Sequence, residues 1–198
     1  MLLKIIFILL LSFSCKYLLS QQISGVINEY STVQNINNEE ITVNNAGIFQ
    51  PCDKVLIIQM KGAQISEQNN SNFGQISNVL NAGNFEFNYI LSINGNIITL
   101  ATPLQQTYST NGNVQLVRVP GLSNPTVTAE LTCPSWNGQT GGIIVFESTG
   151  PVTLQANINA SEKGFRGGQI ASGAFGCNES NYATMIHGKK GEGISIAS

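Results

Sequence analysis

Two short apolar runs within residues 136–168 constrain the fold of this chain more than any other feature. The runs cover residues 142–146 and 152–158, and turn residues follow each of them. Short runs that are rich in Val, Ile and Phe and bounded by Gly and Pro predict β-strands. In the second run every other residue is apolar, which predicts a strand with one buried face and one solvent-exposed face.

The spacing of these two runs suits either a β-hairpin or successive turns of a coil of short strands. Glycines at positions 164, 167 and 168 permit tight bends where such a coil turns its corners. The chain shows no strict repeat, so a second β-sandwich stays open as the alternative to a β-solenoid.

The composition excludes several classes of protein. Charged residues make up only 10% of the 198 residues and the net charge is -2, whereas a nucleic-acid-binding protein presents a basic stripe. Hydrophobic residues make up 42%, which is enough to build a core and argues against disorder. The abundance of Asn, Gln, Ser, Thr and Gly is typical of an extracellular all-β protein.

The first twenty residues have the order of a secretory signal peptide. Lys4 precedes an apolar run over residues 5–13, and the small residue Ser20 comes just before Gln21. The run is shorter than the roughly 20 apolar residues that span a membrane. We therefore expect cleavage near Ser20, a mature protein outside the cytoplasm and no transmembrane segment after cleavage. Acylation of Cys15, as in a lipoprotein, is the alternative.

Residues 21–120 predict a compact β domain. The run over residues 54–60 is the most apolar after the first twenty residues, which indicates a strand that is buried on both faces or a central strand. Residues 85–93 alternate, with the aromatic and aliphatic side chains on one face. Residues 94–96, Asn-Gly-Asn, predict a hairpin turn, because Asn-Gly tolerates the positive φ values of a type I′ turn. About six strands in such a segment suit a small sandwich or barrel.

The fold class that follows is all-β. We expect a signal peptide over residues 1–20, a small β-sandwich or barrel-like domain over residues 21–120, and the start of a Gly-rich β-solenoid, resembling a parallel β-helix, over residues 121–198. The chain ends just as a new strand starts at Ile194, without a capping element. The sequence thus predicts that this coil is truncated and that its open edge self-associates.

Few residues are suited to catalysis. His187 is the single histidine, and a hydrolytic triad would have to be built around it in a Gly-rich tail. Glu86 and Glu147 are the best candidates for a carboxylate pair, but solvent-facing positions on alternating strands are the favoured interpretation of both. Asp53 stands alone, so clustered oxygen ligands for a metal are missing. We predict no catalytic residue, no metal site and no cofactor.

Three residues are candidates for ligand binding. Trp136 and Tyr182 are suited to stacking on a sugar, and Arg166 lies in a Gly-rich turn where backbone N–H groups can meet an anion. The simpler interpretation places Trp136 in the core, Phe165 in the core and Arg166 in a pair at a bend.

Cys52, Cys133 and Cys177 remain after removal of the leader, which allows at most one bridge among three possible pairings. We expect Cys52 and Cys133 to pair and Cys177 to stay free. Such a bridge would close a long loop and contribute about 4 kcal/mol.

Five segments resemble one known family. Residues 55–63, 82–90, 114–120, 136–147 and 164–168 are similar to stretches of long, secreted, adhesin-like surface proteins associated with gliding motility in Bacteroidota. The resemblance implies a secreted or cell-surface protein of the type IX secretion cargo type. Such proteins usually end in a C-terminal sorting domain, and the sequence shows none.

Together these observations predict a non-catalytic, exported, structural or adhesive protein that forms the N-terminal part of a longer adhesin-like chain. Its expected partner is a surface polysaccharide or another cell-surface protein. The alternative is a carbohydrate-binding or carbohydrate-active β-helix protein, and exposure of several aromatic rings on one face would favour binding.

Overall fold

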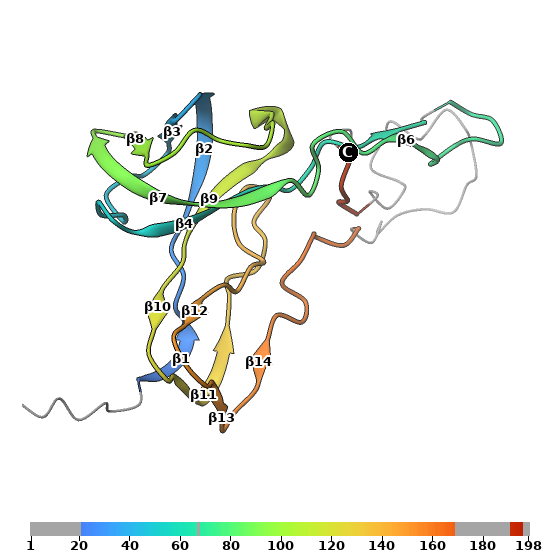
Figure 1. Cartoon of the computed structure of the whole chain (residues 1–198). Helices are drawn as coiled ribbons and strands as arrows, with labels where there is room; N and C mark the ends of the chain where they lie inside the picture. Colours follow the sequence, from blue (N-terminus) through green and yellow to red (C-terminus); the bar gives the residue numbers. More distant parts are fainter. Residues whose placement is uncertain (1–20, 67, 169–190, 196–198) are drawn as a thin grey trace, which may run out of the picture.

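A computed structural model describes residues 21–66, 68–168 and 191–195. The predicted signal peptide and Cys15, Cys177, Tyr182 and His187 therefore lie outside the described residues. Within them, regular structure is entirely β apart from one short 3-10 turn, η1 (Thr110–Gly112), so the all-β prediction is confirmed. No helix in the described part of the chain is long and apolar enough to cross a membrane. Figure 1 shows a barrel above a smaller unit of short strands.

Six antiparallel strands close the barrel in the order β2-β3-β8-β7-β4-β9. The strands are β2 (Tyr30–Asn37), β3 (Glu40–Val43), β4 (Lys54–Gln59), β7 (Phe85–Asn94), β8 (Ile97–Leu100) and β9 (Val114–Arg118). Their inward side chains form one core with Ile41, Ile57 and Leu116 fully buried. The prediction of a six-stranded barrel-like domain is thereby confirmed.

Strand β4 is buried on both faces, as its sequence predicts. Val55 and Ile57 point into the barrel core. Leu56 points outward and forms a second apolar cluster with Val117 and Val119 of the neighbouring segment. Apolar residues therefore occupy both sides of β4, because the outer wall of the barrel is itself covered there by another part of the chain.

Strand β7 has the opposite orientation to that suggested by its alternation. Asn88 and Ile90 are the buried residues, whereas Phe85, Phe87 and Tyr89 are about half exposed. A register shift between Ile90 and Ser92 changes the face of the residues that follow. Ile93 consequently packs against the barrel core, and the aromatic residues before the shift face outward.

The second unit is a coil of parallel strands. Its strands are β1 (Gln22–Val26), β10 (Gly121–Leu122), β11 (Thr126–Thr132), β12 (Glu147–Ser148), β13 (Thr153–Leu154) and β14 (Ile158–Asn159). β10 pairs with β12, and β11 pairs with β1, β13 and β14. Contacts between successive turns join residues 26 or 27 positions apart, as for Arg166–Glu192 and Thr132–Asn159. The solenoid-like second unit that the sequence predicts is confirmed.

The barrel is inserted into this coil. β1 precedes the barrel in the chain but pairs with β11, which follows the barrel. The barrel unit therefore begins after Val26 and not at residue 21 as expected, because the first strand belongs to the coil.

The two apolar runs that were predicted as strands are only partly strands. Residues 142–146 are extended but lack a strand neighbour, and β12 starts directly after them. Residues 152–158 divide into the separate short strands β13 and β14, because the coil bends between them.

Residues 138–146, here called the junction segment, lie between the barrel and the coil. Ile143 and Val145 pack on the outer barrel cluster around Leu56. Ile144 and Phe146 pack on the coil core. Because neighbouring side chains of an extended segment point in opposite directions, this apolar run joins two hydrophobic clusters.

Polar side chains of the barrel replace the missing strand neighbour of the junction segment. Asn28 Nδ2 donates to the carbonyl of Val145 at 2.5 Å, and the Val145 N–H donates to Asn28 Oδ1 at 3.2 Å. The Tyr30 hydroxyl donates to the carbonyl of Ile143 at 2.6 Å. The side-chain amide of Gln115 donates to the carbonyl of Gly141 and accepts from the N–H of Gly141. These bonds satisfy backbone groups that would otherwise be buried without partners.

Two further contacts complete the described structure. A hairpin of β5 (Gln64–Ile65) and β6 (Ile76–Asn78) projects from the barrel as an arm (Figure 1). Near the C-terminus, Ser195 forms a parallel bridge with Ala63 at the base of this arm. The coil is therefore attached to the barrel at both the junction segment and residues 191–195.

Candidate functional site: the junction cleft and the β7 aromatic row

Trp136 is placed in the interior. Its side chain is only 2% exposed, and its ring lies edge-on to Phe165 with 5.8 Å between the ring centroids. A buried indole has no free face for a ligand, so the stacking role predicted for Trp136 is not supported, and the core interpretation is correct.

Arg166 is held in an ion pair at a bend of the coil. Its Nε donates to Glu192 at 2.9 Å and a second guanidinium nitrogen donates to the other carboxylate oxygen at 2.7 Å. The ammonium of Lys61 lies 3.3 Å from the same carboxylate. Hydrogen bonds from Arg166, together with Lys61, lower the pKa of Glu192 to about 2. Arg166 therefore holds residues 191–195 against the coil through Glu192. This agrees with the simpler interpretation of the sequence, in which Arg166 forms a pair at a bend.

The expected bridge between Cys52 and Cys133 is not formed, because both are free thiols. Cys52 is exposed at the turn before β4, and its N–H donates to the carbonyl of Ile90. Cys133 is buried where β11 ends, and burial raises the pKa of its thiol. The two thiols belong to different environments, one at the barrel surface and one inside the coil.

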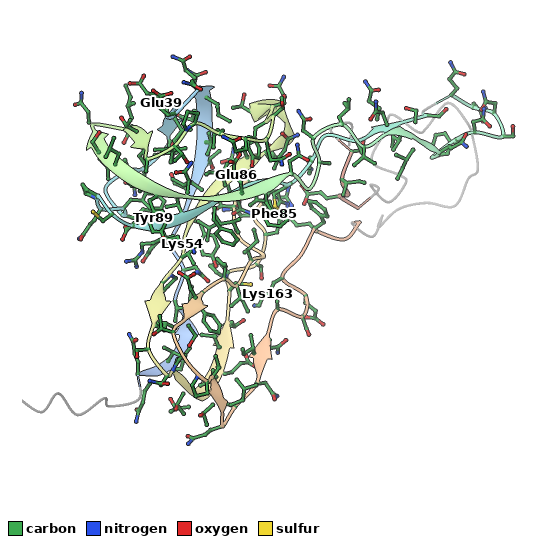
Figure 2. All side chains as sticks on the ribbon, viewed as in Figure 1. Glu39, Lys54, Phe85, Glu86, Tyr89 and Lys163 are labelled. Atoms are coloured by element: carbon green, nitrogen blue, oxygen red, sulfur yellow. The ribbon has the colours of Figure 1, made fainter. Side chains whose placement is uncertain are left out.

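The two candidate glutamates do not form a catalytic pair. Glu86 accepts hydrogen bonds from the backbone N–H groups of Gln105 and Gln106. Glu147 pairs with Lys54 beneath the barrel wall. Figure 2 shows Glu86 on the opposite side of β7 from Lys54 and Tyr89, as expected for alternating side chains. Within the described residues, no group of three His, Cys, Asp or Glu side chains could hold a metal ion.

A cleft of about 410 Å³ lies where the barrel wall meets the coil. The barrel contributes the turn before β4, the middle of β7 and the end of β9, and the coil contributes β10 and β12. The polar and aromatic side chains that line it include Cys52, Asp53, Lys54, Tyr89, Arg118 and Glu147.

An ion pair connects the two walls of this cleft. Lys54 Nζ lies 2.8 Å from Glu147 Oε1, and this hydrogen bond raises the pKa of Lys54. The same ammonium lies 5.3 Å from the ring centroid of Phe87 and 5.7 Å from that of Tyr89. Lys54 therefore positions the coil edge next to the aromatic side chains of β7.

Phe85, Phe87 and Tyr89 form a row on the outer face of β7, here called the aromatic row. They are 56%, 47% and 49% exposed. Alternate residues of a strand are about 7 Å apart, so the row extends over about 14 Å. Its cross-strand partners on β4 are Ile58, Leu56 and Lys54. The aromatic row is thus the open continuation of the surface that the coil covers on β4 (Figure 2).

Arg118 is an unmatched cation at the cleft. Its Nε is buried and has no hydrogen-bond partner in the described structure. The ion pairs of the described residues involve Lys54, Lys61 and Arg166, and Arg118 forms none of them. The backbone of Arg118 is fixed on both sides, by the carbonyl of Glu29 and by the side chain of Asn28.

Sequence reasoning missed Lys54, Tyr89 and Arg118 as site residues. The alternation over residues 85–93 was visible, but it indicated only that the aromatic side chains share a face. Which face is buried depends on the register of β7 with β4, which the sequence does not mark.

Comparisons with known proteins identify no family. No protein-family model matches the chain, and no curated protein matches it. Among solved structures, the chain is similar to the gp54 tailspike of Acinetobacter baumannii bacteriophage AP22, solved with a capsular saccharide, at 14% identity and a TM-score of 0.35 over 65% of this chain. It is also similar to the gp49 tailspike of Pseudomonas phage LKA1, at 12% identity and a TM-score of 0.30 over 56% of this chain.

The gp61 tailspike of Pseudomonas phage phi297 matches at 10% identity and a TM-score of 0.34 over 68% of this chain. The matched regions are 21%, 19% and 22% of the three tailspike chains, so this chain spans about a fifth of their length.

Proposed function

We propose that this chain is an exported, non-catalytic, adhesive protein that binds a polysaccharide along the aromatic row and in the junction cleft. The observation that carries the proposal is the placement of three half-exposed aromatic rings on one strand that leads into a cleft lined with charged groups. Ligand sites combine apolar and aromatic walls with a few polar groups that orient the ligand.

The chemistry of a sugar chain suits both parts of this surface. Pyranose rings present apolar C–H faces, which pack on aromatic side chains, and hydroxyl groups, which bond to polar residues. Tyr89 lies in both parts, because it ends the aromatic row and lines the cleft. Exposed apolar surface of this kind on a soluble domain marks a binding region.

The non-catalytic part of the proposal rests on the carboxylates. Glu86 holds a loop, and Glu147 holds Lys54, which lies on the opposite side of β7 from Glu86. Glycoside hydrolysis requires two carboxyl groups about 5–10 Å apart on either side of one bond. Export and a surface location rest on the leader-like first twenty residues and on the resemblance to secreted adhesin-like proteins.

The test is affinity electrophoresis of the full chain in gels that contain soluble polysaccharides. Tyr89→Ala is expected to weaken retardation by a binding polysaccharide about tenfold, equivalent to about 1.4 kcal/mol. The matched control is Phe73→Ala, which removes an aromatic ring that is 66% exposed on the arm, away from the cleft. Equal loss in both variants, or no retardation of the parent protein by any polysaccharide, would contradict the proposal.

A further inference from the structure

We infer that the junction cleft selects polysaccharides that carry acidic groups, with Arg118 as the residue that binds the acid. The inference rests on the proposed function, since it specifies the class of sugar for the same site. It starts from the charges of the cleft, in which Arg118 is the cation without a counter-ion among the described residues.

The other charges of the cleft are engaged. Lys54 and Glu147 neutralise each other at 2.8 Å. Asp53 Oδ2 accepts a hydrogen bond from the backbone N–H of Gln50 at 2.8 Å, and this bond fixes the turn before β4. Asp53 keeps its negative charge, and Arg118 is the cation of this cleft that a ligand can complement without breaking an ion pair of the protein.

The position of Arg118 is well defined before any ligand arrives. Its N–H donates to the carbonyl of Glu29 at 2.9 Å, and its carbonyl accepts from Asn28 at 2.9 Å. A guanidinium binds a carboxylate or a sulfate ester through two parallel hydrogen bonds, which are stronger than bonds between neutral groups. A fixed backbone reduces the ordering that binding requires.

Tyr89 and Arg118 both line the cleft, on β7 and β9, the strands on either side of β4. A chain of uronic acids fits this arrangement, because each residue offers a C–H face for the ring and a carboxylate for the guanidinium. A neutral glucan offers only the first of these groups. The preference for acidic polysaccharide is therefore expected to depend on Arg118, whereas binding of either polysaccharide depends on Tyr89.

The native thiol of Cys52 provides a reporter, because it is exposed and lines the cleft. The experiment measures alkylation of Cys52 in the full chain by peptide mapping, with increasing polygalacturonate or dextran. In the parent protein, polygalacturonate is expected to protect Cys52 at concentrations about tenfold lower than dextran does. Arg118→Gln is expected to remove this difference by weakening protection by polygalacturonate more than protection by dextran. The buried thiol of Cys133 serves as the control for folding in each reaction.

A second variant works in the opposite direction. Glu147→Gln releases the ammonium of Lys54 to the ligand, so protection by polygalacturonate is expected to strengthen relative to protection by dextran. If Cys133 becomes reactive in Arg118→Gln, that variant is not folded correctly, and Glu147→Gln is used to test acid selection instead. Unchanged or weaker protection of Cys52 by polygalacturonate in Glu147→Gln overturns the inference.

The outcomes separate the two proposals. Equal protection by polygalacturonate and dextran in the parent protein overturns acid selection but leaves polysaccharide binding in place. Failure of both polymers to protect Cys52 overturns both. A preference for polygalacturonate that persists in Arg118→Gln overturns the role of Arg118.

Discussion

The barrel and the coil are stabilised in different ways. Each barrel strand has a hydrogen-bonded neighbour on both sides, and twelve buried residues form one core. The coil is open, four of its six strands have only two residues, and its core contains four buried residues, namely Ile23, Leu122, Val127 and Leu131. Closure removes unpaired strand edges, whereas a short coil retains them.

The difference shows that the coil depends on the barrel. Asn28, Tyr30 and Gln115 bond the backbone of the junction segment, and Leu56 provides the apolar surface beneath it. The barrel gains comparatively little from these contacts, because its own strands are already paired. The cleft lies between the two units, so its geometry depends on how firmly the coil is attached.

The largest effects are expected from the two cores. Leu116→Ala in the barrel and Leu131→Ala in the coil both remove a fully buried side chain, and each should lower the free energy of unfolding by about 3 kcal/mol. Trp136, the single tryptophan, reports on the coil by fluorescence, while far-UV circular dichroism is dominated by the barrel.

In urea titrations, Leu116→Ala should shift both signals together, because the coil cannot remain folded without the barrel. Leu131→Ala should shift the Trp136 transition to lower urea than the circular dichroism transition. Coincident transitions in Leu131→Ala would show that the two units unfold as one.

A smaller effect is expected at the junction. Asn28→Ala leaves both backbone groups of Val145 without partners, which should destabilise the coil by about 2 kcal/mol. The matched control is Asn35→Ala on the exposed face of β2, with an expected change below about 0.5 kcal/mol. Urea unfolding followed by Trp136 fluorescence measures the stability of both variants. Equal unfolding midpoints for Asn28→Ala and Asn35→Ala would refute the role of Asn28.

The smallest effect is expected at the C-terminal attachment. The pKa of Glu192 is lowered from 4.5 to about 2, so its ion pairs are fully present above pH 4.5 and are lost as the pH falls through 2. Hydrogen exchange at the amides of Gly62 and Ala63, which donate to Ile194, should accelerate over this range. In Glu192→Gln the exchange should already be fast at neutral pH, and acid should accelerate it no further through this group.

Much of the barrel could be predicted from the sequence, because its signals are local. The apolar run of β4 and the Asn-Gly-Asn signal for the turn between β7 and β8 each indicate their structure within a few residues. The loop residues of that turn are Gly95 and Asn96, because Asn94 pairs with Ile97, and only Gly95 has the positive φ that a type I′ turn requires at both positions. The coil had a local signal that was not recognised, since residues 126–132 and 153–159 share the pattern of Thr, an aliphatic residue, and a second aliphatic residue four positions later. The pairing of β1 with β11 has no such signal, because the whole barrel separates them.

The candidate site was harder to predict than the fold. Trp136 was proposed because aromatic residues often bind sugars, but its burial depends on Phe165, far along the chain. The exposed aromatic rings belong to a strand whose alternation looks like that of a core strand, and their outward orientation follows from the register of β7 with the outer face of β4. A cleft between two units depends on contacts across the chain, such as Lys54 with Glu147, which a local pattern does not contain.

The central claim is that the barrel is stable by itself and that its polar side chains hold the coil in place. Native-state hydrogen exchange of the full chain tests it most directly, through the amides of Ile57 and Leu116 in the barrel and of Val127 and Leu131 in the coil. The claim predicts that the barrel amides exchange with a higher free energy of opening, and that Asn28→Ala lowers the value for the coil amides alone. Equal free energies of opening in both units, lowered together by Asn28→Ala, would contradict it.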